Sequence, residues 1–220
     1  MGRRKARLAL TIGDPGGIGP EITAKLLCGG VLPKGAELLI IGSAGSLLRE
    51  APSIREICVV ADSDAVEEIE KETSPLIVDT GSGKTVPVGK PTAEGGIISA
   101  RAIEVAVELA KEKKIDGIVT GPVSKEALAM AGCRYRGHTE MLAELFGAPD
   151  CQMMMVAGDF RVLILTRHIP IGDVAGAVTR ERIVSAVRVA SEALERDFGV
   201  ERPRMAVAAL NPHAGDGGLI

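Results

Sequence analysis

The chain has 220 residues, of which 46% are hydrophobic and only 2% aromatic, so its core has to be built from aliphatic side chains. This composition suits strands buried on both faces, and it argues against a protein that stacks single-stranded nucleic acid on aromatic rings. The net charge of −3 gives no reason to expect a polyanionic partner, although a few local donors could hold a small phosphorylated substrate.

The N-terminus resembles a signal peptide only in its first residues. A short basic stretch precedes the apolar run at residues 8–12, but this run is too short, and Gly13 and Pro15 interrupt it. No apolar run reaches transmembrane length. We therefore expect a soluble, cytoplasmic protein. The cysteines lack CxxC spacing and are expected to be buried, reduced thiols: Cys28, Cys58, Cys133 and Cys151.

Short aliphatic runs alternate with helical patterns along the chain. Strands are expected at residues 7–12, 37–41, 57–61, 75–79, 116–120, 161–166 and 204–210. The clearest helices span residues 96–113 and 179–198, with Thr179 as N-cap and Gly199 at the end of the second. In the first of them, one helical face carries Ile98, Ala102, Val105, Ala106 and Leu109. Alternating strands and helices predict a mainly parallel sheet covered on both sides.

Two features modify this pattern. The strand-like runs at residues 152–156 and 161–166 flank a short segment containing Gly158 and Asp159, which predicts an antiparallel hairpin and therefore a mixed sheet. The stretch 80–96 is rich in Gly, Pro, Thr and Lys and predicts a long loop between two lobes. We accordingly place a first α/β lobe at residues 1–90 and a second lobe at residues 91–220.

Two glycine-rich segments imitate nucleotide-binding motifs. Residues 81–85 (GSGKT) resemble the end of a P-loop, but Val78 stands where the motif needs glycine, and Pro87 follows instead of a helix. The cluster Gly13–Gly19 lacks the third glycine of the Rossmann fingerprint. It still predicts either a tight strand-to-helix turn or a ligand-facing loop, with Asp14 after the strand and Pro20 opening a helix.

Residues 120–128 (TGPVSKEAL) also follow an aliphatic strand. Ser124 is a good N-cap for a short helix, which places Lys125 in its first turn near the carboxyl end of the strand. Open α/β sheets bind ligands at that edge. Lys125 is therefore either a ligand-binding residue or an ordinary surface lysine.

All three histidines lie at the ends of predicted elements. His138 belongs to GHTE, residues 137–140, where Thr139 can cap the following helix. A helix N-terminus favours an anionic ligand, although His138 could also be a structural hydrogen-bonding group. His168 and His213 each follow a predicted strand, but they are far apart in the sequence, so no local spacing supports a metal site.

Several segments, in this order, resemble the 4-hydroxythreonine-4-phosphate dehydrogenase family. They are TIGDPGGIGPEI (11–22), TGPVSKEAL (120–128), GHTE (137–140), HIP (168–170) and LNPHAGDGG (210–218). The resemblance implies an isocitrate/isopropylmalate dehydrogenase-like α/β/α sandwich, with two lobes around a cleft. It implies NAD or NADP and a divalent metal (Zn, Mg or Co) as cofactors, and a cytoplasmic homodimer with shared active sites. By the same resemblance, His138 and Thr139 bind substrate, and His168 and His213 bind the metal.

The implied reaction is the metal-dependent, NAD(P)-linked oxidation and decarboxylation of 4-phosphooxy-L-threonine to 3-amino-2-oxopropyl phosphate, a step of pyridoxal 5'-phosphate biosynthesis. Family members are longer and supply a third metal-binding histidine, so we expect this chain to be truncated at its C-terminus. Two alternatives stay open. One is a related dehydrogenase of D-threonate or D-erythronate 4-phosphate, and the other is a non-catalytic, metabolite-binding fragment of the same fold.

Overall fold

The computed structural model describes residues 5–30, 35–57, 59–62, 75–84 and 86–219. The chain forms two compact units, Met1–Ala148 and Pro149–Ile220. This division differs from the lobe boundary at residue 90 that the sequence suggested. The lobes at residues 1–90 and 91–220 stay a prediction about the family fold.

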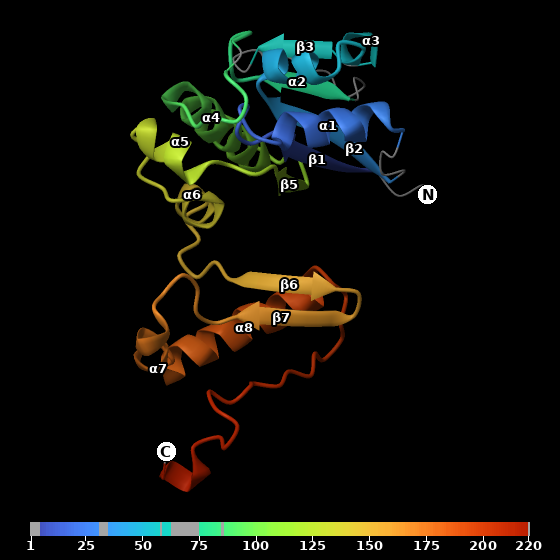
Figure 1. Ribbon diagram of the computed structural model, residues 1–220. Coiled ribbons are helices and arrows are strands. Elements are labelled where there is room, and N and C mark those ends of the chain that lie inside the picture. The colour runs from blue at the N-terminus through green and yellow to red at the C-terminus, as the bar shows by residue number, and fades with distance from the viewer. Residues whose placement is uncertain (1–4, 31–34, 58, 63–74, 85, 220) are drawn as a thin grey trace. The chain divides into compact units, whose positions relative to one another are not determined.

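A parallel, five-stranded sheet forms the centre of the first unit among the described residues (Figure 1). Its order is β3-β4-β2-β1-β5. The strands are β1 (Ala6–Thr11), β2 (Ala36–Gly42), β3 (Val59–Asp62), β4 (Leu76–Asp79) and β5 (Gly117–Thr120). In the register of β1, Leu10 lies opposite Ile40 of β2 and Val119 of β5. The strands expected near these positions are confirmed, with bounds shifted by one or two residues.

Helices cover both faces of this sheet, as the aliphatic strand pattern predicted. On one face lie α1 (Gly19–Cys28), α2 (Ala44–Glu50) and α3 (Ile54–Ile57), and on the other lies α4 (Ala93–Lys111) (Figure 1). Alternate strand residues point to opposite faces. Leu39 and Ile41 therefore pack with Ala102 and Val105 of α4, whereas Ile40 packs with Leu47 of α2. The expected α/β/α sandwich is confirmed.

Two short helices follow β5 and pack beside α4. They are α5 (Lys125–Met130) and α6 (His138–Leu145). Met141 of α6 is buried against Ile103 and Val107 of α4. Ser124 caps α5 as predicted, because its side chain accepts a hydrogen bond from the Ala127 amide. The predicted cap of α6 is wrong, since a Thr139 cap would start the helix at Glu140, whereas α6 starts two residues earlier at His138 and has no side-chain cap.

The second unit contains the antiparallel hairpin that the sequence predicted. Strands β6 (Met153–Ala157) and β7 (Phe160–Ile164) pair as expected, but they form a sheet of their own instead of joining the parallel strands. The hairpin is followed by η2 (Ile171–Asp173), α7 (Val174–Ala177), α8 (Arg180–Arg196) and η3 (Asp216–Gly218). The Arg161 guanidinium lies 4.7 Å from the ring centre of Phe198, which links β7 to the segment after α8.

The strand predicted at residues 204–210 is wrong. The structure gives residues 203–209 no regular secondary structure, and Val207 and Leu210 are 64% and 61% exposed. Alternating or aliphatic sequence favours a strand only where another strand offers its free edge. No described strand pairs with this segment, so its strand propensity is not realised.

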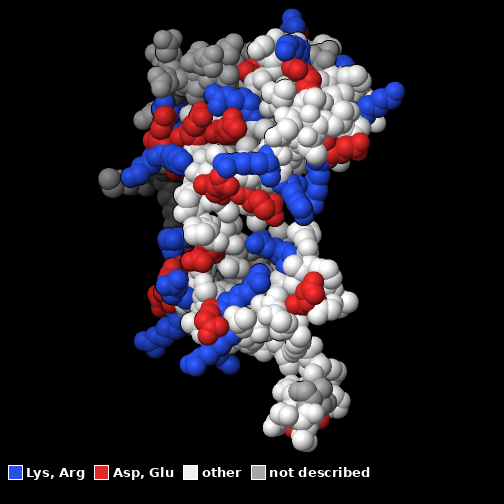
Figure 2. All heavy atoms as spheres, turned by 90° about the vertical axis from the view of Figure 1, so that its left-hand side faces the viewer, with Lys and Arg blue, Asp and Glu red and all other residues white. Residues whose placement is uncertain are grey.

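The described cysteines are free, as predicted, but they are less buried than predicted. Cys28 is exposed rather than buried, Cys133 and Cys151 are half-buried, and all three are free, whereas Cys58 lies outside the described residues. Among the described helices, none is long and apolar enough to cross a membrane. On the face drawn in Figure 2, basic and acidic side chains are interspersed.

Candidate functional site

The carboxyl ends of the parallel strands meet at one edge of the sheet, where open α/β folds bind ligands. The loops after β1 and β5 are joined there. The Asp14 amide donates to the Pro122 carbonyl at 2.9 Å, and the Gly121 amide donates to the Thr11 carbonyl at 2.7 Å. A Cβ on Gly121 would lie 2.4 Å from the Ile12 carbonyl oxygen, so only glycine allows this approach. Two of the motifs singled out in the sequence therefore form one contiguous surface.

The glycine cluster after β1 forms a tight turn into α1. Asp14 is only 6% exposed, and its Oδ1 accepts a hydrogen bond from the Gly16 amide at 2.9 Å. A Cβ on Gly19 would lie 1.9 Å from the Ile12 carbonyl oxygen, which explains the glycine by backbone packing. Of the two sequence interpretations, these contacts support the tight turn for Asp14 and Gly19. Pro20 lies in the first turn of α1 as predicted.

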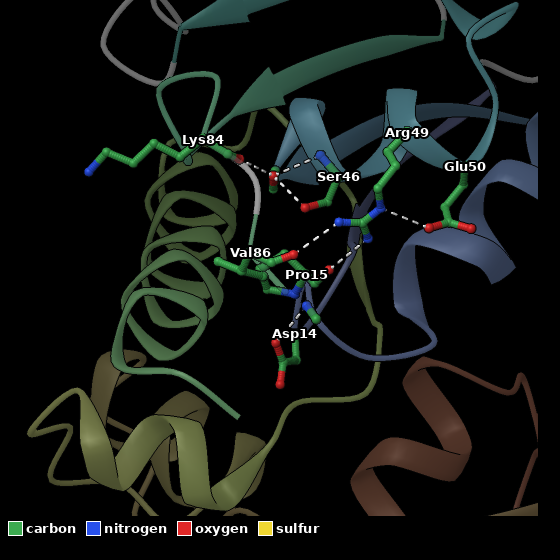
Figure 3. Close-up of polar contacts among 9 residues, drawn as sticks. Asp14, Pro15, Ser46, Arg49, Glu50, Lys84 and Val86 are labelled. Atoms are coloured by element: carbon green, nitrogen blue, oxygen red, sulfur yellow. Dashed lines mark hydrogen bonds and ion pairs between the residues drawn. The ribbon is translucent and has the colours of Figure 1, made fainter. Parts of the chain in front are cut away.

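Arg49 of α2 braces this turn against the loop that follows β4 (Figure 3). Its guanidinium donates to the Val86 carbonyl at 3.0 Å and to the Pro15 carbonyl at 3.4 Å. The Arg49 Nε also donates to Glu50 at 3.2 Å. No sequence motif marks Arg49, because both loop acceptors are backbone carbonyls, which every residue carries. The brace was missed for that reason.

Asp79, at the end of β4, accepts hydrogen bonds from backbone amides of the GSGKT segment and from Ala44. Its Oδ1 accepts from the amides of Ala44 and Gly81 at 3.0 and 2.9 Å, and its Oδ2 accepts from the Gly83 amide at 2.7 Å. The Lys84 ammonium pairs with Glu94 at 2.9 Å. Because an internal carboxylate already uses these amides, the contacts support the rejection of a phosphate-binding loop at residues 81–84.

His138 is the first residue of α6 and is half-buried in the first unit. Burial lowers the pKa of its imidazole from the ordinary value of about 6.5, and a hydrogen bond with the Gly121 backbone opposes this only in part. Its Nε2 is enclosed and, within the part of the chain that the structure describes, has no hydrogen-bond partner. The imidazole therefore keeps one enclosed nitrogen that forms no hydrogen bond with a described residue. Thr139, the next residue, is also half-buried.

His168 follows β7 and has a backbone conformation that residues other than glycine seldom adopt. Its φ is 54°, in the left-handed region. Residues in such conformations cost about 1–3 kcal/mol and gather at functional sites, although histidine is among the more tolerant types. The conformation agrees with a specialised role for His168, which stays a prediction.

His213 is oriented by its own turn. Its amide donates to the Asn211 side chain at 3.0 Å, and its Nδ1 lies 3.5 Å from Asp216 Oδ2. Histidines that bind metals commonly direct one ring nitrogen to a carboxylate and the other to the ion. The His213 side chain is 64% exposed, so its Nε2 is open to a ligand. This arrangement fits an imidazole donor.

The described residues do not assemble a complete metal centre. The described residues contain no group of three or more His, Cys, Asp or Glu side chains placed to hold one ion. His138 belongs to the first unit, and His168 and His213 belong to the second. The two metal ligands expected from the sequence, His168 and His213, therefore remain predictions.

Comparison with known proteins gives a consistent result. The sequence profile described as pyridoxal phosphate biosynthetic protein PdxA matches residues 34–220. A 4-hydroxythreonine-4-phosphate dehydrogenase from Zymomonas mobilis is 40% identical over 97% of this chain. A Bradyrhizobium diazoefficiens protein, whose name assigns it provisionally as a D-threonate 4-phosphate dehydrogenase, is 39% identical over 96% of the chain.

A solved structure shares the fold. The crystal structure of a 4-hydroxythreonine-4-phosphate dehydrogenase from Klebsiella pneumoniae superposes on 98% of this chain with a TM-score of 0.80 and 34% identity. The chain spans 63% of the Zymomonas protein, 62% of the Bradyrhizobium protein and 66% of the Klebsiella chain.

Proposed function

This chain belongs to the pyridoxal phosphate biosynthetic protein PdxA family, and on that premise we propose that it oxidises and decarboxylates 4-phosphooxy-L-threonine in an NAD(P)-linked, metal-dependent reaction. The product is 3-amino-2-oxopropyl phosphate. The hydroxyl proton is released, and the carbinol hydrogen leaves as hydride to NAD(P)+, which gives a ketone. The carboxylate then leaves as CO2, and the carbon that carried it takes up one proton, which balances the proton released by the hydroxyl. The activity is placed in the cytoplasm.

The observation that carries this proposal is the environment of His138. Its imidazole is held at the carboxyl edge of the sheet by the hydrogen bond with the Gly121 backbone, and its enclosed Nε2 lacks a partner among the described residues. An unpartnered polar nitrogen costs free energy unless a ligand completes its hydrogen bond. The adjoining Thr139 offers a hydroxyl group, so the two side chains can orient a hydroxylated, anionic substrate.

The cofactors are proposed from the family and from the chemistry of the donors. When bound, NAD or NADP supplies the hydride acceptor, and a divalent ion such as Zn, Mg or Co supplies positive charge beside the hydroxyl and carboxylate oxygens. His168 and His213 would hold the ion, and Asp216 would keep His213 in the orientation described above. His138, neutral near neutral pH, would orient the substrate without adding a competing charge.

A homodimer with shared active sites is proposed as well. The hairpin presents large apolar side chains to solvent, namely Met155, Val156, Phe160 and Val162, of which Phe160 is 71% exposed. Exposed apolar surface of this kind is typical of protein interfaces. The surface supports the dimer, and the two-lobed arrangement with a boundary near residue 90 is proposed on the family fold alone.

A second substrate deserves a direct comparison, because one similar protein bears the D-threonate 4-phosphate dehydrogenase name. Both substrates carry a 4-phosphate, a hydroxyl group and a carboxylate, and they differ at the amino-bearing carbon. None of the contacts around His138 and Thr139 distinguishes an amino group from a hydroxyl group. D-threonate 4-phosphate is therefore the alternative substrate.

The test is an assay of the 220-residue chain with each substrate, NAD or NADP, and each divalent metal. We expect reduced nicotinamide and CO2 from 4-phosphooxy-L-threonine, and a loss of kcat/KM of about 100-fold in His138→Gln, since misplacing a substrate is costly to that degree. Turnover of D-threonate 4-phosphate alone would establish the alternative. Turnover of neither substrate under any of these conditions would refute the proposed activity.

A further inference from the structure

We propose that Lys125 is a further substrate-binding residue, whose ammonium group binds the phosphate of the substrate beside His138. The inference rests on the proposed function, because it names the group that the same site recognises. Three features of Lys125 support it. Its backbone is fixed, its side chain reaches Gly137 at the start of α6, and its charge has no protein partner among the described residues.

The backbone of Lys125 is held from two sides. The Ser124 side chain accepts from the Ala127 amide at 3.1 Å, which fixes the start of α5. On the other side, a Cβ on Gly96 would lie 2.0 Å from the Ala127 carbonyl oxygen, so α4 and α5 are in direct backbone contact. The loop before α5 is itself hydrogen-bonded to Thr11 of β1 through the Gly121 amide, and to Asp14 in the loop after β1 through the Pro122 carbonyl. Lys125 therefore projects from a rigid position at the carboxyl edge of the sheet.

Its side chain extends to the start of α6. A Cβ built on Gly137 would lie 3.9 Å from Lys125 Cε. Gly137 immediately precedes His138. The His138 ring is hydrogen-bonded to the backbone of Gly121, which begins the loop that leads to Lys125. The ammonium group and the enclosed imidazole nitrogen thus belong to the same small region of the first unit.

The charge of Lys125 is not used within the described structure. Three lysines of the first unit form ion pairs, namely Lys25 with Glu21, Lys84 with Glu94 and Lys114 with Glu112. Lys90 and Lys111 form none with a described residue, so what distinguishes Lys125 is its place beside Gly137 and not its free charge alone. The Lys125 ammonium forms no hydrogen bond or ion pair with another described residue. It is exposed and can be reached by a solute.

Phosphate is the group that this cation suits. An ammonium is a compact point charge with three donors, which binds a phosphate oxygen from any direction. In the proposed reaction, the hydroxyl and carboxylate of the substrate belong to the reacting end, whereas the phosphate lies at the other end and is free to be held elsewhere. Lys125 would hold that phosphate while His138 and Thr139 orient the carbon chain.

One competing explanation is also visible in the structure. Glu140 approaches the same place, since its Oε2 lies 3.7 Å from a Cβ built on Gly137. Lys125 could serve merely as a transient surface partner of Glu140, which would contribute only about 0–1 kcal/mol of stability. In that case, removing either charge would have the same effect, and phosphate would be irrelevant.

The experiment is a titration of the full 220-residue chain with inorganic phosphate. Binding is monitored by the NMR chemical shifts of the backbone amides around Gly137. We compare wild type with Lys125→Met, Lys125→Arg, Glu140→Gln and the control Lys111→Met, an exposed lysine at the far end of α4. Thermal unfolding of each variant checks that it folds. Lys125→Arg keeps the positive charge and serves as the second variant if Lys125→Met is unstable.

We expect phosphate binding about tenfold weaker in Lys125→Met, as loss of one charge-assisted hydrogen bond implies, and unchanged binding in Lys111→Met. Lys125→Arg should retain most of the affinity, and Glu140→Gln should bind phosphate at least as well as wild type. Equal affinity in wild type and Lys125→Met would overturn the inference. So would a wild-type chain that binds no phosphate, or parallel losses in Lys125→Met and Glu140→Gln.

A kinetic measurement separates this inference from the proposed function. With 4-phosphooxy-L-threonine as substrate, Lys125→Met should raise KM about tenfold and change kcat little, because the lost contact is made equally in the ground state and the transition state. A fall in kcat at unchanged KM would count against phosphate binding by Lys125. Phosphate binding through Lys125 without turnover would refute the dehydrogenase activity alone.

Discussion

His138 shows how a single residue can be prepared for a ligand by its surroundings. Burial disfavours the charged imidazole, and the hydrogen bond with Gly121 compensates only in part, so the pKa is lowered. The sequence indicated a histidine at a helix start, but it could not indicate how deeply the ring is enclosed. That depends on the loop after β5, which reaches His138 only in the folded chain.

The lowered pKa has a consequence for stability. The unfolded chain protonates His138 near pH 6.5, whereas the folded protein does so only at lower pH, so the unfolded state binds more protons in that window. The contribution of His138 to stability should therefore be complete above about pH 6.5 and decline as pH falls through the folded-state pKa. We expect His138→Gln to flatten this acid-side decline.

Two measurements check this prediction. An NMR titration of the His138 imidazole in the folded chain should have its midpoint below 6.5, the ordinary value. Urea unfolding at a series of pH values should give a smaller acid-side slope for His138→Gln than for wild type. A midpoint at or above the ordinary value would contradict the account of burial.

At the scale of the elements, much of the fold could be predicted because the decisive signals are local. Thr179 accepts from the Arg182 amide as the cap of α8, and Ser124 caps α5, both as their residue types indicated. The prediction of a Thr139 cap was wrong because α6 starts at His138, with Gly137 in an extended conformation before it. Contacts of a side chain with backbone atoms, such as those of the Arg49 guanidinium with two carbonyls, leave no pattern in the sequence.

The packing of α4 on α5 yields a test of its own. Gly96→Ala places a Cβ 2.0 Å from the Ala127 carbonyl oxygen and 2.8 Å from the Ala131 Cβ, so the two helices must separate. We expect the free energy of unfolding to fall by about 1–3 kcal/mol, the usual cost of overpacking, although alanine favours a helix. Urea unfolding measures the change.

Gly176→Ala is the matched control, because a Cβ on Gly176 meets nothing within 4 Å. It lies in α7 and should leave stability unchanged or raise it by up to about 1 kcal/mol through helix propensity. Equal stability of the Gly96 and Gly176 variants would mean that α4 and α5 do not meet as closely as the contact distances require.

At the scale of the whole molecule, local sequence patterns do not predict contacts between segments that are distant in the sequence. The segment at residues 204–210 carries strand-forming residues, yet it has no described neighbour to pair with and remains irregular. The same reasoning applies to the metal ligands, since an ion site depends on residues that are distant in the sequence. His168 and His213 could be named only through the resemblance to a family, and the orientation of His213 by Asp216 emerged only from the structure.

The proposal that His168 and His213 bind one divalent ion is tested most directly by metal titration in a calorimeter. We predict that Zn or Co binds the wild-type chain. His168→Ala and His213→Ala should each weaken metal binding by at least roughly 10–100-fold, because the loss of a residue that only supports a metal ligand already costs that much. His138→Gln should bind metal normally, because His138 is assigned to the substrate. Wild-type affinity in His168→Ala or His213→Ala, or no binding to the wild-type chain, would contradict the account.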